Sequence, residues 1–377
     1  MSDPTEPPPG TPERFAAPFG RRALLRGAFA TGLASLAAAC TRSEQLTSST
    51  AGPRPSTPPP TSSTTAPRSS PPPGSTVAST TSTTSSTSTT TTSEPATSEP
   101  TTSEPPDTTE PTEPTDPSLP PGAYDPEALY VALYGHPGST RLGVLGEQDA
   151  VAGATRAALV AAAYDGFGRR VVPTFEIIAS VAGADSGSDG DFSNEFSFEK
   201  FEPHLDAAAA NDMHVVFDLQ SGRSRFPDQA REYEALWLQP HASIALDPEW
   251  RVGPDQQPGG GRIGTVDATE VNETIDYIDG LITANGLPPK MCIVHQFAES
   301  MITDKQRIRG TENVQVVIHM DGFGTLELKR GTWGRVVSTL PEGAFTGWKN
   351  FYDEDQPTPT PAETMANEPA PRFVSYQ

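Results

Sequence analysis

The sequence is poor in positive charge and in cysteine. Its 377 residues contain 26 lysines and arginines against 48 aspartates and glutamates, which gives a formal net charge of −22. A nucleic-acid partner requires a basic face, so this balance excludes one. The only cysteines are Cys40 and Cys292. Cys292 lies inside an apolar run, which indicates a buried small side chain and not a nucleophile.

Sequence signatures of bound cofactors and metals are also missing. The segment 134–139, YGHPGS, does not fit the glycine-rich GxGxxG turn of dinucleotide-binding sheets. No HxH or HExxH spacing occurs among the 6 histidines. Three aspartates, Asp185, Asp189 and Asp191, lack the spacing of an EF-hand. We therefore predict neither a metal nor a cofactor.

The first 40 residues have the features of an export signal. Arg21 and Arg22 precede a short apolar stretch of small residues, 27–39, which is too short for a typical membrane span. Paired arginines in this position indicate the twin-arginine export route. The stretch ends in LAAAC, which resembles the lipobox of bacterial lipoproteins. That resemblance implies lipidation of Cys40 and a membrane anchor on the extracytoplasmic face. The alternative is a plain signal peptide cut near Ala39.

The next segment, 41–123, consists almost entirely of serine, threonine, proline and a few acids. Such a composition buries too little apolar surface to offset the entropy lost on ordering, so we predict a disordered linker. Its role would be to let a folded domain stand away from a membrane. The chain thus divides into a signal peptide (1–40), a Ser/Thr/Pro-rich tether (41–123) and one folded domain (124–377).

The folded domain shows short apolar runs that end in polar residues. Eight such runs are read as strands, at 129–134, 171–178, 214–219, 243–246, 291–294, 314–318, 345–351 and 373–375. Between them lie stretches with helical character, at 148–164, 198–210, 227–237, 267–285, 297–309 and 325–340.

The stretch 267–285 has the clearest helix signals. Asp267 is a predicted N-cap, Glu270 completes a capping-box-like start, and Gly286 ends the helix. Strands that alternate with helices indicate parallel strands. Eight of them in about 250 residues predict an α/β domain of the (β/α)8 TIM-barrel type, present as a monomer. A doubly wound open sheet is the alternative.

In such a barrel the carboxyl ends of the strands converge on one mouth, where catalytic residues gather. The residues expected there share a place at or just after a strand end. They are His136, Glu176, Asp218, Gln220, Asp247, Glu249, Trp250, His295, Gln296, His319, Asp321, Lys349, Tyr352 and Tyr376.

The stretch 242–250, ASIALDPEW, places two acids at the end of a short apolar run. If the backbone stays extended, Asp247 and Glu249 point to the same face. A neighbouring negative charge raises the pKa of a carboxyl group, and glycoside hydrolysis needs one carboxyl held protonated. We therefore assign Glu249 as general acid and Asp247 as its electrostatic partner, with the aromatic face of Trp250 available to a sugar ring. The other mouth residues are expected to bind the substrate.

Two resemblances agree with this interpretation. ALDPEW resembles the Asp-x-Glu strand end of barrel-fold muramidases and chitinase-like glycosidases, in which the last glutamate is the acid; the longer DxxDxDxE pattern of the chitinases is absent. With LDPEW, VHQF, IHMDG and WKNFYDED, the domain is similar to an uncharacterised family of actinobacterial exported lipoproteins. That similarity implies a barrel and a location in the cell envelope.

Three functions remain open from sequence. The first is a membrane-tethered, extracytoplasmic glycoside hydrolase that acts on cell-wall or envelope carbohydrate. The second is a lipoprotein that binds such a glycan without cleaving it. The third is a metal-dependent hydrolase in which His136, His295 and His319 act with Asp218 or Asp321.

Overall fold

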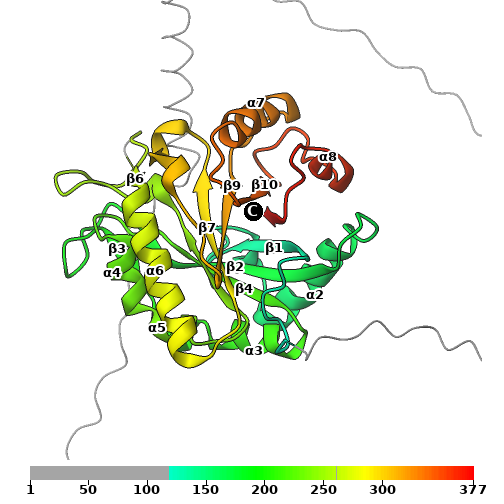
Figure 1. Ribbon diagram of the computed structural model, residues 1–377, viewed down its shortest axis with the longest axis horizontal. Coiled ribbons are helices and arrows are strands. Elements are labelled where there is room, and N and C mark those ends of the chain that lie inside the picture. Colours follow the sequence, from blue (N-terminus) through cyan, green and yellow to red (C-terminus); the bar gives the residue numbers. More distant parts are fainter. Residues whose placement is uncertain (1–118, 260) are drawn as a thin grey trace, which may run out of the picture. The chain divides into compact units, whose positions relative to one another are not determined.

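The computed structural model describes residues 119–377, apart from residue 260. The expectations for the signal peptide, for Cys40 and for nearly all of the linker lie outside these residues. Within them, eight parallel strands alternate with helices (Figure 1). The strands are β1 (Leu129–Gly135), β2 (Val171–Ala182), β4 (His214–Leu219), β5 (Ala242–Leu246), β7 (Lys290–Gln296), β9 (Val314–Met320), β10 (Phe345–Asn350) and β11 (Phe373–Tyr376).

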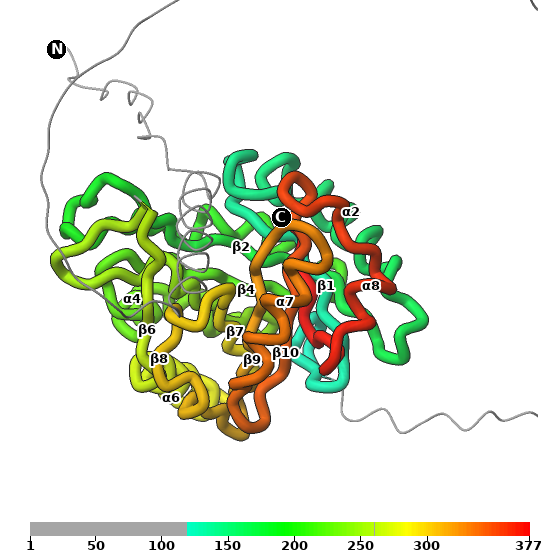
Figure 2. Tube along the Cα trace, turned by 90° about the horizontal axis from the view of Figure 1, so that it is seen from above, coloured from blue at the N-terminus to red at the C-terminus, as the bar shows by residue number. Residues whose placement is uncertain are grey.

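The strands close into a barrel in their order along the chain. Each pairs in parallel with the next, and β11 pairs in parallel with β1, with Val131 opposite Val374. Figure 2 shows β7, β9 and β10 lying side by side. The predicted (β/α)8 barrel is confirmed, and the closing pair excludes the open sheet.

Side-chain alternation along the strands separates two cores. Leu129, Val131 and Leu133 face outward and belong to the core under the helices. The residues between them face the barrel interior, where an apolar layer takes side chains from seven of the eight barrel strands, with two each from β1 and β7. That layer contains Tyr130, Ala132, Val172, Val216, Ala245, Met291, Ile293, Val317 and Phe373. Residues two or four positions further along each strand therefore form the next layers toward the mouth.

Seven α-helices are present in the part of the chain that the structure describes. They are α2 (Ala150–Ala162), α3 (Glu202–Ala210), α4 (Phe226–Glu232), α5 (Glu234–Trp237), α6 (Ala268–Asn285), α7 (Leu326–Val337) and α8 (Pro361–Met365). Figure 1 shows α6 along the outside of the barrel and α7 and α8 near the end of the chain. In residues 119–259 and 261–377 no helix is long and apolar enough to cross a membrane.

The helix predictions are confirmed in part. Asp267 caps α6 by accepting a hydrogen bond from the Thr269 N–H, and Gly286 ends the helix in the left-handed conformation at φ 62°. Glu270 does not complete a capping box, because its carboxylate bonds the Phe226 N–H and the Arg251 guanidinium instead.

The helix predicted at 297–309 is wrong. Short 3-10 turns at Glu299–Met301 and Lys305–Arg307 flank β8 (Ile302–Thr303), which pairs with β6 (Val266–Asp267). Asp304 has φ 53°, a conformation that interrupts a helix. The buried Lys305 Nζ donates to Gln296 Oε1 at 2.8 Å and to the Val336 carbonyl, so tertiary contacts override the local propensity.

The chain joins the barrel at the floor, where the strands begin. The Gly122 carbonyl lies 2.8 Å from Nδ1 of His214, the first residue of β4, and the Gly122 N–H donates to Asp212 Oδ1. Gly122 has φ 71°, and a Cβ there would lie 2.1 Å from the Met213 carbonyl oxygen. Tyr124 then stacks on Tyr130 and fills the lower end of the interior.

Candidate active site

A cavity of about 460 Å³ opens at the carboxyl ends of the strands. Its wall includes Tyr134 from β1, Gln220 after β4, Trp250 after β5 and Tyr352 after β10. Small-molecule sites commonly occupy roughly 300–1,000 Å³ and combine aromatic walls with a few polar groups. The cavity therefore has the place and the size of a TIM-barrel active site.

A polar layer lies inside the barrel between the apolar layers and the mouth. Its members follow from the alternation of each strand, and all of them are buried. They are Tyr134, Glu176, Asp218, Asp247, His295, His319 and Ser375. Asp321, directly after β9, and Lys349 on β10 are buried as well.

His295 lies between two carboxylates at the centre of this layer. Its Nε2 is 2.9 Å from Glu176 Oε1, and its Nδ1 is 3.1 Å from Asp321 Oδ2. Burial opposes protonation of His295, but Asp218, Glu176 and Asp321 outweigh it and raise the pKa of His295 well above its usual value. Burial likewise opposes ionisation of Glu176, yet His295, His319 and Lys349 lower its pKa to about 2. An imidazolium that donates one hydrogen bond to each carboxylate accounts for both distances.

His319 is the neighbour of His295 in the β7–β9 pairing, and its environment is different. Burial, followed by the positive charge of His295, lowers the pKa of His319 to about 3, so its ring is neutral. Its Nε2 lies 3.3 Å from Ser375 Oγ, and its Nδ1 lies 3.9 Å from Glu176 Oε1. The ring packs closely on Gly347, where a Cβ would lie 2.9 Å from His319 Cδ2.

Tyr134 connects the buried layer to the cavity. It lines the cavity, and its hydroxyl donates to Asp218 Oδ2 at 2.7 Å. The Lys349 ammonium lies 3.1 Å from the centre of the Tyr134 ring and 3.9 Å from Asp321 Oδ2. Burial raises the pKa of Asp218. A ligand in the cavity would thus contact Tyr134, which in turn contacts the buried Asp218 and Lys349.

The two acids assigned from sequence lie at the end of β5. The Asp247 N–H donates to the Leu219 carbonyl at 3.0 Å, which extends the β4–β5 ladder by one residue. The expectation that Glu249 shares the face of Asp247 on an extended strand is wrong, because Pro248–Trp250 forms a 3-10 turn. Proline favours the first position of such a turn. Both acids are nonetheless buried, and Trp250 of the same turn lines the cavity.

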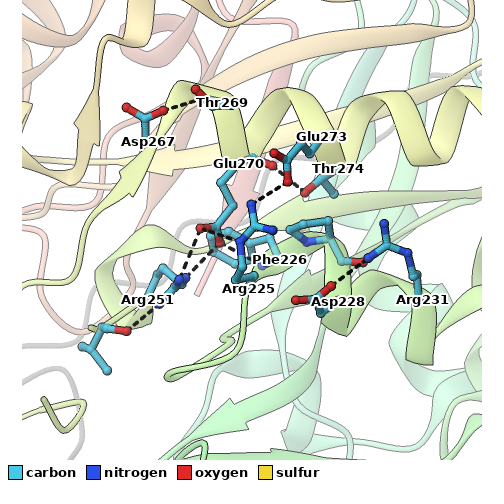
Figure 3. A network of polar contacts seen from close by, with 12 residues as sticks. Arg225, Phe226, Asp228, Arg231, Arg251, Asp267, Thr269, Glu270, Glu273 and Thr274 are labelled. Atoms are coloured by element: carbon cyan, nitrogen blue, oxygen red, sulfur yellow. Dashed lines mark hydrogen bonds and ion pairs between the residues drawn. The ribbon is translucent and has the colours of Figure 1, made fainter. Parts of the chain in front are cut away.

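The segment after this turn is fixed to α4 and α6. Glu270 accepts from Arg251 Nε at 2.9 Å and Nη2 at 3.2 Å, and from the Phe226 N–H at 2.9 Å (Figure 3). The Gly264 N–H donates to the Glu249 carbonyl at 2.7 Å. The loop 251–265 therefore fixes the backbone of Glu249 through this hydrogen bond.

Several other predicted site residues contact neighbouring elements and not the buried layer. His136 Nδ1 lies 2.8 Å from the Ile178 carbonyl, and the His136 ring packs on Phe196. Gln296 accepts from Lys305, and the Tyr376 hydroxyl is 2.7 Å from that of Tyr164, which follows α2. The substrate-binding role of these residues stays a prediction.

Two predicted residues do line the cavity beside Trp250. Gln220 Oε1 accepts from the Ala182 N–H at 3.2 Å, which fixes its side chain at the wall. Tyr352 is 41% exposed, stacks on Tyr376 and lies under the Arg156 guanidinium. Its exposed ring is available to a flat apolar partner.

Sequence reasoning did not assign Ser375 to the site, and it did not connect the hydroxyl of Tyr134 with Asp218. The signal for Tyr134 was present in the alternation of 129–134, because Tyr130, Ala132 and Tyr134 share one face. Ser375 carried no comparable signal, since its role depends on closure of the barrel beside His319.

No protein-family model matches the chain, and no curated protein matches it. The TIM-barrel fold is compatible with glycoside-hydrolase-like enzymes, and the chemistry of the site must be derived from its own residues.

Proposed function

We propose that the mouth of the barrel binds and hydrolyses a cell-wall or envelope carbohydrate. The observation that carries this proposal is the Pro248–Trp250 turn, which places Glu249 directly before Trp250, a residue of the cavity wall, at the end of β5. Sugar rings stack on aromatic faces, and glycosidic bonds are cleaved by carboxyl groups beside them. Tyr352 supplies a second aromatic face to the same cavity.

In this proposal Glu249 gives its proton to the glycosidic oxygen as the bond from that oxygen to the anomeric carbon breaks. Asp247 is fully buried and acts from beneath the cavity as the electrostatic partner of Glu249, without touching the sugar. A water molecule then adds to the anomeric carbon and returns a proton to Glu249, which restores the acid. Each cycle consumes one water and releases two sugar fragments.

The buried layer has a positioning role. Glu176, His295 and Asp321 are at most 2% exposed and lie beneath Tyr134, so we assign them to hold the cavity floor and not to touch the sugar. Fixed dipoles and charges beneath a site lower the cost of reorganisation when charge develops above them.

The test is turnover of purified cell-wall glycans by the purified protein, measured as new reducing ends. Glu249→Gln should reduce turnover by at least about 10²–10⁴-fold, because an amide keeps the shape of the side chain but delivers no proton. Asp247→Asn should also slow the reaction. Glu202→Gln is the matched control, since Glu202 is an exposed glutamate of α3, and its turnover should equal that of the unaltered protein.

The binding-only alternative predicts a different set of results. The unaltered protein would bind glycan saturably without forming reducing ends, and Trp250→Ala would weaken binding more than Glu249→Gln. Absence of product beside measurable binding would overturn the hydrolase proposal.

We further propose that the protein is exported and held at the extracytoplasmic face of the membrane through lipidated Cys40, as a monomer related to the actinobacterial exported lipoproteins. The support is the arginine pair and the LAAAC segment of the sequence. Cys40→Ser should move the protein from the membrane fraction to the soluble fraction. A variant that stays with the membrane would contradict the anchor.

A further inference from the structure

Three metal-ligand atoms converge inside the barrel. One carboxylate oxygen of Glu176 and one ring nitrogen each of His295 and His319 all lie within 4.8 Å of one another, and the three side chains are fully buried. They come from β2, β7 and β9, so closure of the barrel brings them together. Two imidazoles with one carboxylate form a ligand set that zinc and similar divalent transition metals prefer.

The spacing of the ligand atoms suits such an ion. Zinc with ligands at about 2.0–2.2 Å in tetrahedral geometry separates neighbouring ligand atoms by about 3.3–3.6 Å. Glu176 Oε1 is 2.9 Å from His295 Nε2 and 3.9 Å from His319 Nδ1. Movements of a few tenths of an ångström bring both distances to the required value.

Each histidine is oriented by an oxygen atom that lies beside the ring nitrogen not used for the metal. Asp321 Oδ2 lies 3.1 Å from His295 Nδ1, and Ser375 Oγ lies 3.3 Å from His319 Nε2. Histidines that bind metals typically donate their other N–H to a carboxylate or another oxygen, which fixes the ring and its tautomer. The pairing leaves His295 Nε2 and His319 Nδ1 directed toward Glu176.

Two atoms of this cluster, the second carboxylate oxygen of Glu176 and the ligand nitrogen of His319, lack hydrogen-bond partners among the residues that the structure describes. Both atoms, Glu176 Oε2 and His319 Nδ1, are buried. Buried polar atoms without a partner are costly, and a metal ion would satisfy both.

We propose that Glu176, His295 and His319 bind one divalent transition-metal ion of the zinc class, with Asp321 and Ser375 orienting the two histidines. This set replaces the one considered from sequence, because His136 is bonded to the Ile178 carbonyl instead. The metal site uses neither Glu249 nor Asp247, so the metal proposal and the glycan-hydrolysis proposal are tested independently of each other.

The experiment measures zinc binding directly. Because the site is enclosed, the full chain is refolded with and without zinc, dialysed, and assayed for metal content and for thermal unfolding. The expected result is one zinc per chain and a raised Tm, with no such effect from calcium. Glu176→Gln and His319→Ala should lose the stoichiometric zinc. His241→Ala is the matched control, because His241 is a buried histidine bonded to the Leu205 carbonyl, and it should retain zinc.

A variant that fails to fold is recognised by its far-ultraviolet circular dichroism. Asp321→Asn, which keeps the size of the side chain, then provides the second measurement and should weaken zinc binding about 10–100-fold. The proposal is overturned if refolded protein retains no zinc, or if zinc binds the Glu176, His319 and Asp321 variants as tightly as the unaltered chain. Either result leaves the glycan assay unaffected.

Discussion

His214 and His295 are both fully buried in the barrel interior, and their partners give them opposite properties. His295 has carboxylates on both nitrogens, which raise its pKa. His214 has the Gly122 carbonyl at Nδ1 and Ser243 Oγ at Nε2, both at 2.8 Å. Nδ1 must donate to the carbonyl, and Nε2 accepts from the serine, whose oxygen accepts from the Met291 N–H. Burial lowers the pKa of His214 to about 3, so it stays neutral.

The low pKa of His214 predicts acid sensitivity. An unfolded histidine takes up a proton near pH 6.5, whereas folded His214 does so only near pH 3. The contribution of this residue is therefore complete above pH 6.5 and is lost as the pH falls toward 3, by at most about 1.4 kcal/mol per pH unit. Chemical denaturation at several pH values should show unfolding free energy falling more steeply for the unaltered protein than for His214→Gln.

Other buried histidines titrate in both proteins, so only the difference between the two curves reports on His214. Parallel curves between pH 6.5 and 4 would show that His214 is not held neutral by the fold.

Tyr134 carries a second residue-scale prediction. Tyr134→Phe keeps the ring beneath Lys349 but removes the donor to the buried Asp218. Leaving a buried acceptor without its donor costs about 1–3 kcal/mol, so urea denaturation should show a loss of that size. Tyr277→Phe is the control, because Tyr277 donates to Glu234 in an exposed pair and should change stability by less than about 0.5 kcal/mol. Equal losses in the two variants would contradict the role given to Tyr134.

The residues of the site could be placed from sequence only in part. Strand ends in a barrel share one face of the molecule, so Glu176, Asp218, His295, His319 and Asp321 were correctly expected near one another. Which nitrogen meets which oxygen depends on strand register and closure, and the sequence contains no local signal for either. The expectation that Asp247 and Glu249 share one face was wrong for a different reason, because Pro248 starts a turn where an extended strand had been assumed.

At the scale of elements, Glu270 was expected to cap its own helix, and it bonds segments that are distant in the sequence instead. From α6 it bonds Arg251 after β5 and the first N–H of α4, which ties three elements together (Figure 3). The predicted capping box would have used the same carboxylate inside its own helix. The helix start forms without it because Asp267 still accepts from Thr269.

Glu270→Gln should therefore destabilise the protein and loosen the loop 251–265. Hydrogen bonds to charged groups contribute about 1.5–3 kcal/mol, and the buried Phe226 N–H would meet a weaker acceptor, so a loss of about 1–3 kcal/mol in unfolding free energy is expected. Hydrogen exchange should become faster in 251–265. Glu273→Gln provides the comparison, since Glu273 pairs with Arg225 at the surface and the substitution should cost less than about 0.5 kcal/mol.

At the scale of the whole molecule, closure by β1 and β11 leaves no free edge among the eight barrel strands. Each strand is stabilised by two neighbours, and loss of one opens the ring. We expect residues 119–377 to unfold in one cooperative transition, with circular dichroism and tryptophan fluorescence changing together. Trp237 and Trp250 lie before and after β5, while the rings of Trp333 and Trp348 pack on each other with centres 5.6 Å apart, so the four report on two regions of the barrel. Two separated transitions would show that the barrel consists of independent parts.

The architecture was predictable because eight apolar runs alternate with helical stretches along most of the domain. Each run is too short to be identified as a strand by itself, and its place between two helical stretches identifies it. The additional pieces were not predictable: β3 (Ser193–Glu195) pairs antiparallel with the end of β2, and β6 pairs with β8. These pairings join two or three residues each, which is too few to leave a period in the sequence.

The barrel has a base and an opening, and the preceding chain is attached to the base. Gly122 is bonded to Asp212 and His214 where the strands begin, while Tyr352 and Trp250 surround the cavity where they end. A pull transmitted through the residues before Gly122 reaches those two bonds first and the cavity last. The point of entry at Gly122 lies at the end of the barrel opposite the cavity, so the entry itself leaves the opening clear for a ligand as long as a polymer.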